Sequence, residues 1–434
     1  MKTLLLLILT FSAHQFATAQ EIILEPQSAL GDTPVTITLS GFEAGSEVTL
    51  RARMADETDL LWASYATFEV AEDGTVEPAS QAPLEGTYVE ADPMGLFWSM
   101  QPEGEPEAGF FLSSLEPWVV TLGAEVSGET VATAAAERLA VAPEVTRTEV
   151  RDEGLVGTLF TPPGDGPHPT VIVLGGSEGG LDEGWAALLA SRGYAVLALA
   201  YFGVDELPEE LIEVPLETFY TALNWLAAQD AVDEGRIVLV GASKGGEAAL
   251  LVASRRPEVR AVVAYVPSNV VWQGISFTDF TPRSSWSLAG EGLPFVPYAA
   301  MPETLPDDPE TMVLEPLYRE SLERYEGDEA VIPVEDIGGP VLLISGGDDA
   351  LWPSTLMAER ALERLEGHDR PLEHLEYEEA GHLILNPYVP TWGTEAILGL
   401  AMGGTAQANA EAAADSWPRV LDFLEENLLE ENLR

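Results

Sequence analysis

A strand, a glycine-rich turn and a helix follow one another near the middle of the chain, and they constrain the fold more than any other feature. Residues 237–240 form an apolar run typical of a buried strand, and residues 248–253 favour a helix. Between them, residues 241–245 (GASKG) match the pattern G-x-S-x-G, whose glycines let a sharp turn present the serine hydroxyl at the edge of a sheet. We therefore predict that Ser243 is a nucleophile, with a purely structural turn as the alternative.

Strand-like and helix-like segments alternate after residue 143. The strand-like segments are residues 170–174, 195–200, 237–240, 259–266 and 341–345, and the helix-like segments are residues 182–191, 216–228 and 248–253. This alternation predicts an α/β fold with a doubly wound, mostly parallel sheet and helices on both faces, over residues 143–434. Ligands of such sheets bind beyond the carboxyl ends of the strands, where Ser243 is expected to lie.

Apolar and polar residues alternate with a period of two in the first part of the chain. Residues 35–39, 48–52 and 65–70 follow this pattern, and turn-forming residues separate them. Short strands at such spacing predict an all-β, immunoglobulin-like sandwich of about seven strands over residues 20–142. The aromatic stretch 94–100 interrupts the pattern, either as core of the sandwich or as a surface that packs on the second domain near the active site.

An insertion rich in proline, glutamate and aromatic residues covers about residues 267–335, between two expected strands of the α/β domain. An insertion of this length is more often a lid or pocket wall than an idle loop. Its aromatic side chains would suit an acyl or aryl group, and the alternative is simple packing of a small cap. They are Trp272, Phe277, Phe280, Trp286, Phe295 and Tyr298.

The first 19 residues have the three parts of a signal peptide. Lys2 is basic, residues 4–11 are apolar, and residues 17–19 (ATA) resemble a cleavage site. We therefore predict a signal peptide over residues 1–19 and export to the periplasm or the cell exterior. The apolar part is shorter than the roughly 20 residues that span a bilayer, and no other segment reaches that length, so we expect no membrane span.

The chain is strongly acidic. Aspartate and glutamate number 73 against 20 lysines and arginines, giving a formal net charge of −53. Nucleic-acid binding requires a basic surface, so this partner class is excluded, and a solvated acidic surface is expected instead. Lysine occurs only at Lys2 and Lys244, so its position beside Ser243 indicates either a functional role or an anchor for neighbouring carboxylates.

A serine hydroxyl needs a base to remove its proton, and histidine is the usual one. Of the five histidines, His14 lies in the predicted signal peptide and His168 in a loop before the first long strand. His368 and His374 fall near a helix end and within a strand. His382 directly follows the strand-like residues 375–377, and a loop after the last strand is where this fold needs its base, so His382 is the predicted base.

Two adjacent aspartates follow the apolar run 341–344 and therefore lie at the carboxyl end of an expected strand. We predict Asp349 as the acid that orients the base, with Asp348 in reserve. The order Ser243, Asp349, His382 is the order of the α/β-hydrolases. The alternative is an ordinary α/β domain in which these residues are structural.

An oxyanion requires N–H donors. The residue after the nucleophile, Lys244, is expected to supply one, and Gly176 or Ser177, after the strand 170–174, the other. The glycines of that loop do not form the phosphate-binding pattern G-x-x-x-x-G-K-[ST], and no histidine pair or carboxylate cluster has metal-ligand spacing. We therefore expect no nucleotide cofactor and no metal.

Motifs from both expected domains resemble the acyl-CoA thioesterase and bile acid-CoA:amino acid N-acyltransferase family, whose second domain is a dienelactone-hydrolase-like α/β-hydrolase. In the first domain the matching segments are residues 32–35 (DTPV), 48–52 (VTLRA), 86–88 (GTY) and 92–100 (DPMGLFWSM). In the second they are residues 176–180, 195–201, 241–247, 267–274, 347–349 with Trp352, and 380–382.

By this resemblance the nucleophile is Ser243, the acid Asp349 and the base His382, and Trp272 and Trp352 are candidate substrate contacts. The resemblance implies attack on a thioester carbonyl, an acyl-serine intermediate and its release to water. The acyltransferase branch carries cysteine where this chain has Ser243, which favours hydrolysis. The expected substrate is a small-molecule acyl thioester or ester.

Two other functions are weighed against acyl-CoA hydrolysis. Export would separate the enzyme from coenzyme A, and the acidic chain would repel its phosphates, so an extracytoplasmic carboxylesterase that acts on oxygen esters is the first alternative. A non-catalytic binding protein is the second, and it is disfavoured because a nucleophile, an acid and a base are all present.

Overall fold

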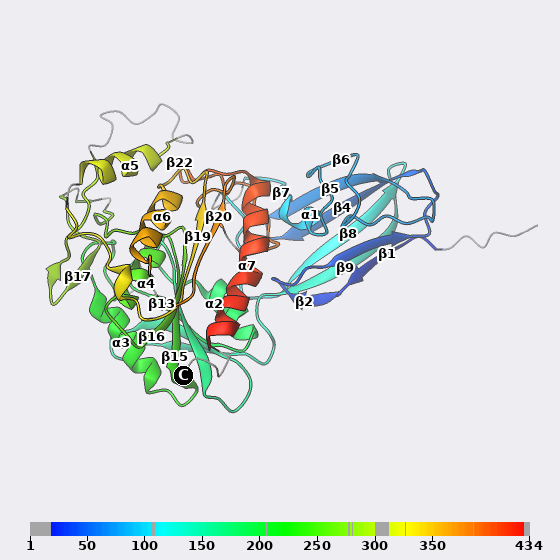
Figure 1. Ribbon diagram of the computed structural model, residues 1–434. Helices are drawn as coiled ribbons and strands as arrows, with labels where there is room; N and C mark the ends of the chain where they lie inside the picture. Colours follow the sequence, from blue (N-terminus) through cyan, green and yellow to red (C-terminus); the bar gives the residue numbers. More distant parts are fainter. Residues whose placement is uncertain are drawn as a thin grey trace, which may run out of the picture.

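The computed structural model describes residues 19–428, except residues 106–108, 205, 277, 280, 300–311, 326, 368 and 385. It consists of a larger α/β domain and a β-rich domain that extends from its side (Figure 1). Residues 1–18 of the predicted signal peptide lie outside the described residues, as do Phe277, Phe280 and His368. Within the described part of the chain, no helix is long and apolar enough to cross a bilayer.

The first domain is built from two sheets. β1 (Glu21–Glu25) pairs with β3 (Thr36–Ser40), and the larger sheet has the order β2-β9-β8-β4-β5-β6, with β7 also on β5. The larger sheet consists of β2 (Ser28–Leu30), β4 (Glu47–Ala55), β5 (Leu61–Glu69), β6 (Glu85–Gly86), β7 (Gln101–Pro102), β8 (Trp118–Val126) and β9 (Glu129–Leu139). All its pairs are antiparallel except β2–β9.

Alternation of side chains explains why the strands of this domain were predictable. Along β4, every second residue from Val48 to Met54 is buried, as expected for a sheet that packs one face on a core. The prediction of a β-rich first domain is confirmed. The described strands exceed the expected seven because β2, β6 and β7 are too short to show a periodic pattern.

The aromatic stretch 94–100 forms a short buried helix, α1 (Gly95–Trp98). Leu96, Phe97 and Trp98 lie in the core cluster of the first domain, and this cluster also includes Val389 of the second domain. The stretch 94–100 is therefore part of the core of the first domain, and it also packs on the second domain. Both predicted roles, core and domain contact, apply to it.

The second domain contains an eight-stranded sheet in the order β10-β11-β13-β12-β15-β16-β19-β20. Its strands are β10 (Thr146–Val150), β11 (Val156–Thr161), β12 (His168–Leu174), β13 (Ala195–Ala200), β15 (Val232–Ala242), β16 (Val259–Tyr265), β19 (Val341–Gly346) and β20 (Leu372–Tyr377). β10–β11 and β11–β13 are antiparallel, and all other pairs are parallel.

Helices cover both faces of this sheet, and the predicted doubly wound α/β fold is confirmed (Figure 1). One face packs on α3 (Leu216–Ala227), α4 (Lys244–Ala253) and α6 (Ser354–Arg364), and the other on α2 (Glu183–Ser191) and α7 (Ala406–Leu428). Successive strand residues enter opposite cores: Ile172 and Leu174 belong to one cluster, Val171 and Val173 to the other. A parallel sheet buried on both faces therefore explains the nearly continuous apolar runs in the sequence.

The insertion 267–335 contains β17 (Trp286–Leu288), β18 (Glu291–Gly292), α5 (Glu315–Arg324) and the short 3-10 helix η2 (Val334–Asp336). β17 also pairs with β14 (Val214–Pro215). Trp272 and Trp286 are fully buried, and each belongs to a different core cluster, with Tyr298 packing on the first and Phe295 on the second. These side chains pack in the core of the cap in this structure.

A partly buried ion pair connects the two domains. Both carboxylate oxygens of Asp32, in the first domain, accept hydrogen bonds from Arg192 at the end of α2, at 2.6 and 3.1 Å. The indole Nε1 of Trp417 in α7 also donates to Asp32, at 2.9 Å. A bidentate pair with a third donor holds the domains in a defined orientation.

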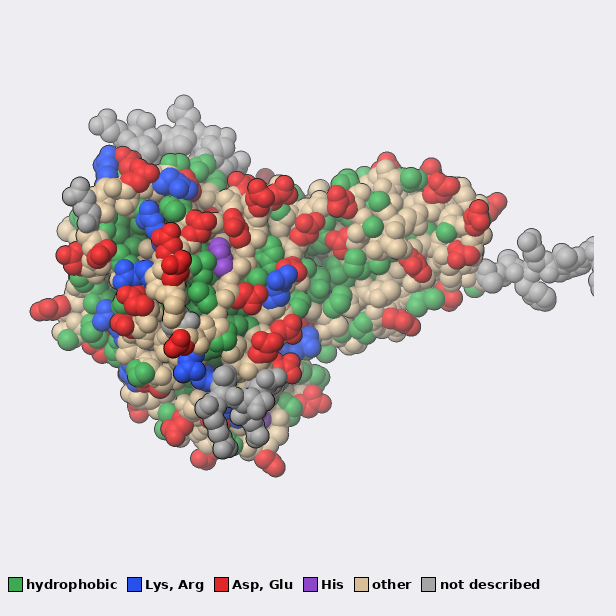
Figure 2. All heavy atoms as spheres, viewed as in Figure 1, with side chains coloured by type: hydrophobic (Ala, Val, Ile, Leu, Met, Phe, Trp, Pro, Cys, Tyr) green, Lys and Arg blue, Asp and Glu red, His purple; other side chains and the backbone are tan. Residues whose placement is uncertain are grey.

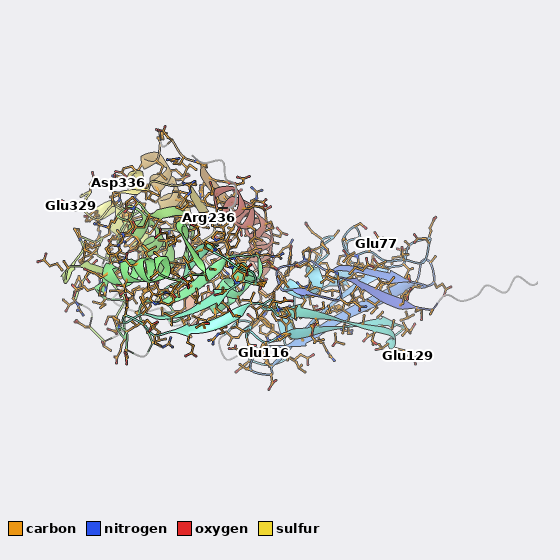
Figure 3. All side chains as sticks on the ribbon, turned by 90° about the horizontal axis from the view of Figure 1, so that it is seen from below. Glu77, Glu116, Glu129, Arg236, Glu329 and Asp336 are labelled. Carbon is orange, nitrogen blue, oxygen red and sulfur yellow. The ribbon has the colours of Figure 1, made fainter. Side chains whose placement is uncertain are left out.

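Acidic side chains are spread over the visible surface of both domains and outnumber the basic ones (Figure 2). Seen from below, Glu77 and Glu129 lie on the first domain, and Glu329 and Asp336 lie at the far side of the second (Figure 3). On the face shown in Figure 2, the acidic side chains are thus distributed over both domains, as expected for a solvated acidic surface.

Candidate active site

Ser243 lies at the turn between β15 and α4 and has the backbone angles φ 53° and ψ −117°. This positive φ is unfavourable for a residue with a side chain, so the surrounding contacts must hold it. The flanking glycines explain how. A Cβ on Gly241 would lie 2.3 Å from the carbonyl oxygen of Gly245, and one on Gly245 would lie 2.2 Å from the carbonyl oxygen of Leu174. The G-x-S-x-G pattern is therefore a packing requirement of this turn.

His382 lies in the loop after β20, and its ring bridges the other two predicted residues. Its Nε2 is 3.0 Å from Ser243 Oγ, and its Nδ1 is 2.9 Å from Asp349 Oδ2. All three residues are buried. The structure thus brings the predicted nucleophile, base and acid into one hydrogen-bonded chain, at the edge of the sheet where the parallel strands end.

The carboxylate of Asp349 is fixed on both sides. While Oδ2 contacts His382, Oδ1 accepts the backbone N–H groups of Leu351 and Trp352 at 3.0 and 3.1 Å. The reserve candidate, Asp348, is exposed and accepts a hydrogen bond from the N–H of Gly404 instead. Of the two adjacent aspartates, Asp349 contacts the imidazole of His382 and Asp348 does not.

The predicted oxyanion donors belong to the start of α4 and to the loop after β12, and their role stays a prediction. Lys244 is the first residue of α4, so its N–H has no acceptor within the helix. In the loop after β12, the N–H of Gly176 already donates to Glu178 Oε1 at 2.7 Å. This contact was not predictable from the sequence, because a carboxylate two residues away can fold back on any such loop. Ser177, which is exposed, is the remaining candidate for the second donor.

The side chain of Lys244 is part of a buried ion pair. Its Nζ lies 2.5 Å from Glu247 Oε2 and 2.8 Å from the hydroxyl of Ser285 in the insertion. Glu247 Oε1 accepts the backbone N–H of Trp272 and the indole N–H of Trp286. Burial lowers the pKa of Lys244 and raises the pKa of Glu247, and their mutual attraction opposes both shifts. These contacts support the anchor role for Lys244, which ties the elbow helix to the cap.

Replacement of Lys244 by methionine should lower the free energy of unfolding by about 3–5 kcal/mol, because the Glu247 carboxylate would stay buried without its cation. Urea unfolding measures this change. Arg419→Met is the matched control, since Arg419 forms a half-exposed pair with Asp415 that should contribute about 1 kcal/mol or less. A loss for Lys244→Met no larger than that of the control would contradict the anchor role.

An aromatic wall links the insertion to the base. The Trp352 ring lies 5.7 Å from the imidazole of His382, and Tyr318 of α5 contacts both Trp352 and Trp272 edge to face. Burial raises the pKa of Tyr318 to about 12, so its hydroxyl stays protonated. Trp352 is therefore next to the reacting groups, whereas Trp272 is separated from them by Tyr318. Both indoles are buried, and their substrate contacts stay a prediction.

The two other histidines that the structure describes, His168 and His374, lie apart from this chain of contacts. His168 is the first residue of β12, at the opposite end of that strand from Leu174. His374, in β20, lies with its Nε2 2.8 Å from the hydroxyl of Ser345, and burial lowers its pKa. This second serine–histidine pair has a fully buried serine, so it offers no accessible nucleophile.

Sequence reasoning missed one segment of the site. Residues 391–405 pass between the loops of His382 and Asp349, and the carbonyl of Met402 accepts the N–H of His382 at 2.8 Å. Gly403 forms a β-bridge with Asp349. In the sequence, only the adjacent glycines 403 and 404 draw attention to this segment, and two adjacent glycines predict no more than a turn.

Two family models match the chain. The model described as Acyl-CoA thioester hydrolase/BAAT N-terminal region covers residues 32–152, and the model described as BAAT / Acyl-CoA thioester hydrolase C terminal covers residues 214–430.

Curated relatives are similar over nearly the whole chain. Acyl-coenzyme A amino acid N-acyltransferase 1 of Mus musculus is 35% identical over 94% of this chain and 98% of its own length. Acyl-coenzyme A thioesterase 6 of the same organism is 35% identical over 92% of this chain and 94% of its own length. Among solved structures, a dienelactone hydrolase from Anabaena variabilis has a TM-score of 0.36 and 20% identity, over 64% of this chain and 98% of that one.

Proposed function

The chain belongs to the acyl-CoA thioester hydrolase/BAAT family, and we propose that it hydrolyses acyl thioesters through an acyl-serine intermediate on Ser243. The family model and the relatives named as thioesterases make it a thioester or carboxylic ester hydrolase. The observation that supports the serine mechanism is the continuous contact from Ser243 Oγ through the imidazole of His382 to the carboxylate of Asp349.

In the first proposed step, Ser243 Oγ attacks the carbonyl carbon of the thioester while His382 Nε2 takes the hydroxyl proton. The carbonyl oxygen becomes an oxyanion that the N–H groups of Lys244 and Ser177 stabilise. The tetrahedral intermediate then collapses, the C–S bond breaks, and the imidazolium gives its proton to the departing thiolate. The products of this step are the free thiol and an acyl ester on Ser243.

Water completes the proposed cycle. His382 removes a proton from a water molecule as its oxygen attacks the acyl-serine carbonyl, and the C–O bond to Ser243 breaks. The proton on the imidazolium returns to Ser243 Oγ, and the carboxylic acid leaves. Asp349 stabilises the imidazolium in both steps, and the two N–H groups that hold its Oδ1 keep its other oxygen facing His382.

A paired substrate assay tests this proposal. We expect one preparation to release free thiol from palmitoyl-CoA faster than it releases nitrophenol from nitrophenyl palmitate, since the acyl group is the same and only the leaving group differs. Turnover of the nitrophenyl ester alone would reject the thioester preference and support an oxygen esterase. If neither compound is hydrolysed and Ser243 does not react with a fluorophosphonate, the enzyme proposal fails and the binding-protein alternative stands.

A carboxylesterase acting outside the cytoplasm is the second candidate, and the charge of the chain favours it. With a net charge of −53, the protein repels the phosphates of coenzyme A at low ionic strength. The arginines of the insertion do not offset this, because Arg283, Arg319 and Arg324 each pair with a carboxylate. The proposed export of the chain, directed by residues 1–19, would also place it away from cytosolic acyl-CoA.

A further inference from the structure

The segment of residues 391–405, called the strap from here on, lies between the two loops that carry His382 and Asp349. Its carbonyl at Met402 accepts the N–H groups of both His382, at 2.8 Å, and Ala350, at 3.3 Å. Gly404 forms a β-bridge with Ala380, in the His382 loop, and its N–H donates to Asp348. The strap therefore contacts the base loop and the acid loop at once.

The strap packs closely against these loops, backbone to backbone. A Cβ on Gly403 would lie 1.8 Å from the carbonyl oxygen of Asp348, and a Cβ on Gly381 would lie 2.1 Å from the carbonyl oxygen of Gly403. Gly403 and Gly404 both have positive φ, at 80° and 72°, which favours glycine there independently of space. A displacement of the strap must therefore move the backbone next to His382.

A buried relay of hydrogen bonds joins the base loop to the first domain. The N–H of Gly381 donates to Asn409 Oδ1 at 2.8 Å, and Asn409 Nδ2 donates to Thr394 Oγ1 at 3.0 Å. The Thr394 hydroxyl then donates to the carbonyl of Thr391 at 2.7 Å. Finally the N–H of Thr391 donates to the carbonyl of Trp98, in α1 of the sandwich, at 3.0 Å. Asn409 and Thr394 have no exposed surface.

We propose that Asn409 and Thr394 are positioning residues for His382, and that the sandwich domain, through Trp98, sets the position of the base. This inference rests on the proposed function, because it takes His382 as the base of that reaction. The buried polar groups of Asn409 and Thr394 gain little for stability over an apolar core, but their bonds fix the loop that precedes the imidazole. A displacement of about 1 Å at a catalytic group lowers the rate on the order of 100-fold.

Thr394→Val tests the relay, because valine has the shape of threonine and lacks only the hydroxyl. It removes both the acceptor for Asn409 Nδ2 and the donor to Thr391. We expect kcat to fall roughly 10- to 100-fold with little change in KM, since the base moves while the acyl-binding surface stays. Thr394→Ser keeps the hydroxyl and should restore most of kcat relative to the valine variant.

The rate per active site gives a readout that a loss of folding does not produce. A displaced base lowers kcat at every active site, whereas unfolding lowers only the number of active sites. We therefore expect kcat per site to fall in Thr394→Val and to be largely restored in Thr394→Ser. All rates are divided by the number of active sites, counted by complete reaction with a fluorophosphonate.

The possible outcomes separate this inference from the proposed function. If Thr394→Val has fewer active sites or a lower melting temperature but an unchanged kcat per site, the role is only structural and the inference is overturned. If the unaltered protein shows no turnover and no label on Ser243, the proposed function itself fails. Should Thr394→Val not fold, Asn409→Leu removes the acceptor for the Gly381 N–H and the donor to Thr394 Oγ1 at a similar side-chain volume, and it is judged by the same kcat per site and melting temperature.

Discussion

Replacement of Ser243 by alanine should lower kcat about 10⁶-fold, because the reaction then has no nucleophile and only binding and the oxyanion donors remain. The substitution removes one hydroxyl from a turn whose strained backbone is held by Gly241 and Gly245, so the fold should be unaffected. Thiol release from palmitoyl-CoA, followed at saturating substrate, measures the loss.

Ser345→Ala provides the matched control for this variant. Ser345 is also a buried serine within hydrogen-bond distance of a histidine, with its Oγ 2.8 Å from His374 Nε2. Because it is fully buried, its loss should change kcat only a few-fold. A small effect of Ser243→Ala, or an equally large effect of Ser345→Ala, would show that the nucleophile is misassigned.

Replacement of Asp349 by asparagine should lower kcat about 10⁴-fold, because the amide does not hold the imidazole in the tautomer whose Nε2 accepts the serine proton. Asparagine has the shape of aspartate, and its side-chain oxygen can accept the same N–H groups of Leu351 and Trp352 that Asp349 Oδ1 accepts. The side chain at position 349 should therefore keep its orientation in this variant. Steady-state kinetics with the same thioester measures this loss.

Asp348→Asn separates a specific effect from the loss of any negative charge near the site. Asp348 is the adjacent residue, is exposed and contacts Gly404 of the strap instead of His382. We expect its kcat to stay within about tenfold of the unaltered protein, since an asparagine oxygen can still accept the Gly404 N–H. If Asp348→Asn were the more damaging substitution, the acid would have to be reassigned to Asp348.

Features that depend on neighbours along the chain were predictable from the sequence. The turn at Ser243 is one, because its strand, glycines and helix are contiguous and each element restricts the next. The parallel sheet is another such feature, because strands that are buried on both faces must be apolar along their whole length, and this pattern is visible in the sequence. The predicted order of nucleophile, acid and base also depended only on which loop follows which strand.

Features that depend on contacts between distant residues were not predictable. The strap next to His382 is fixed by the fit of Gly403 against Asp348, and nothing local to either residue indicates this contact. The same limit applies to the insertion. Its tryptophans have the composition of a ligand pocket, but Trp286 is buried because Glu247, on another element, accepts its indole N–H. Composition alone does not distinguish a pocket wall from a core.

The inactivation of the enzyme by a fluorophosphonate tests most directly whether Ser243 is the nucleophile of a serine hydrolase. We expect thioesterase activity to fall in proportion to the incorporation of one phosphonyl group per chain, and we expect peptide mass spectrometry to place this group on Ser243. Full activity in protein whose Ser243 is completely phosphonylated, or loss of activity with the group on a different residue, would contradict this assignment.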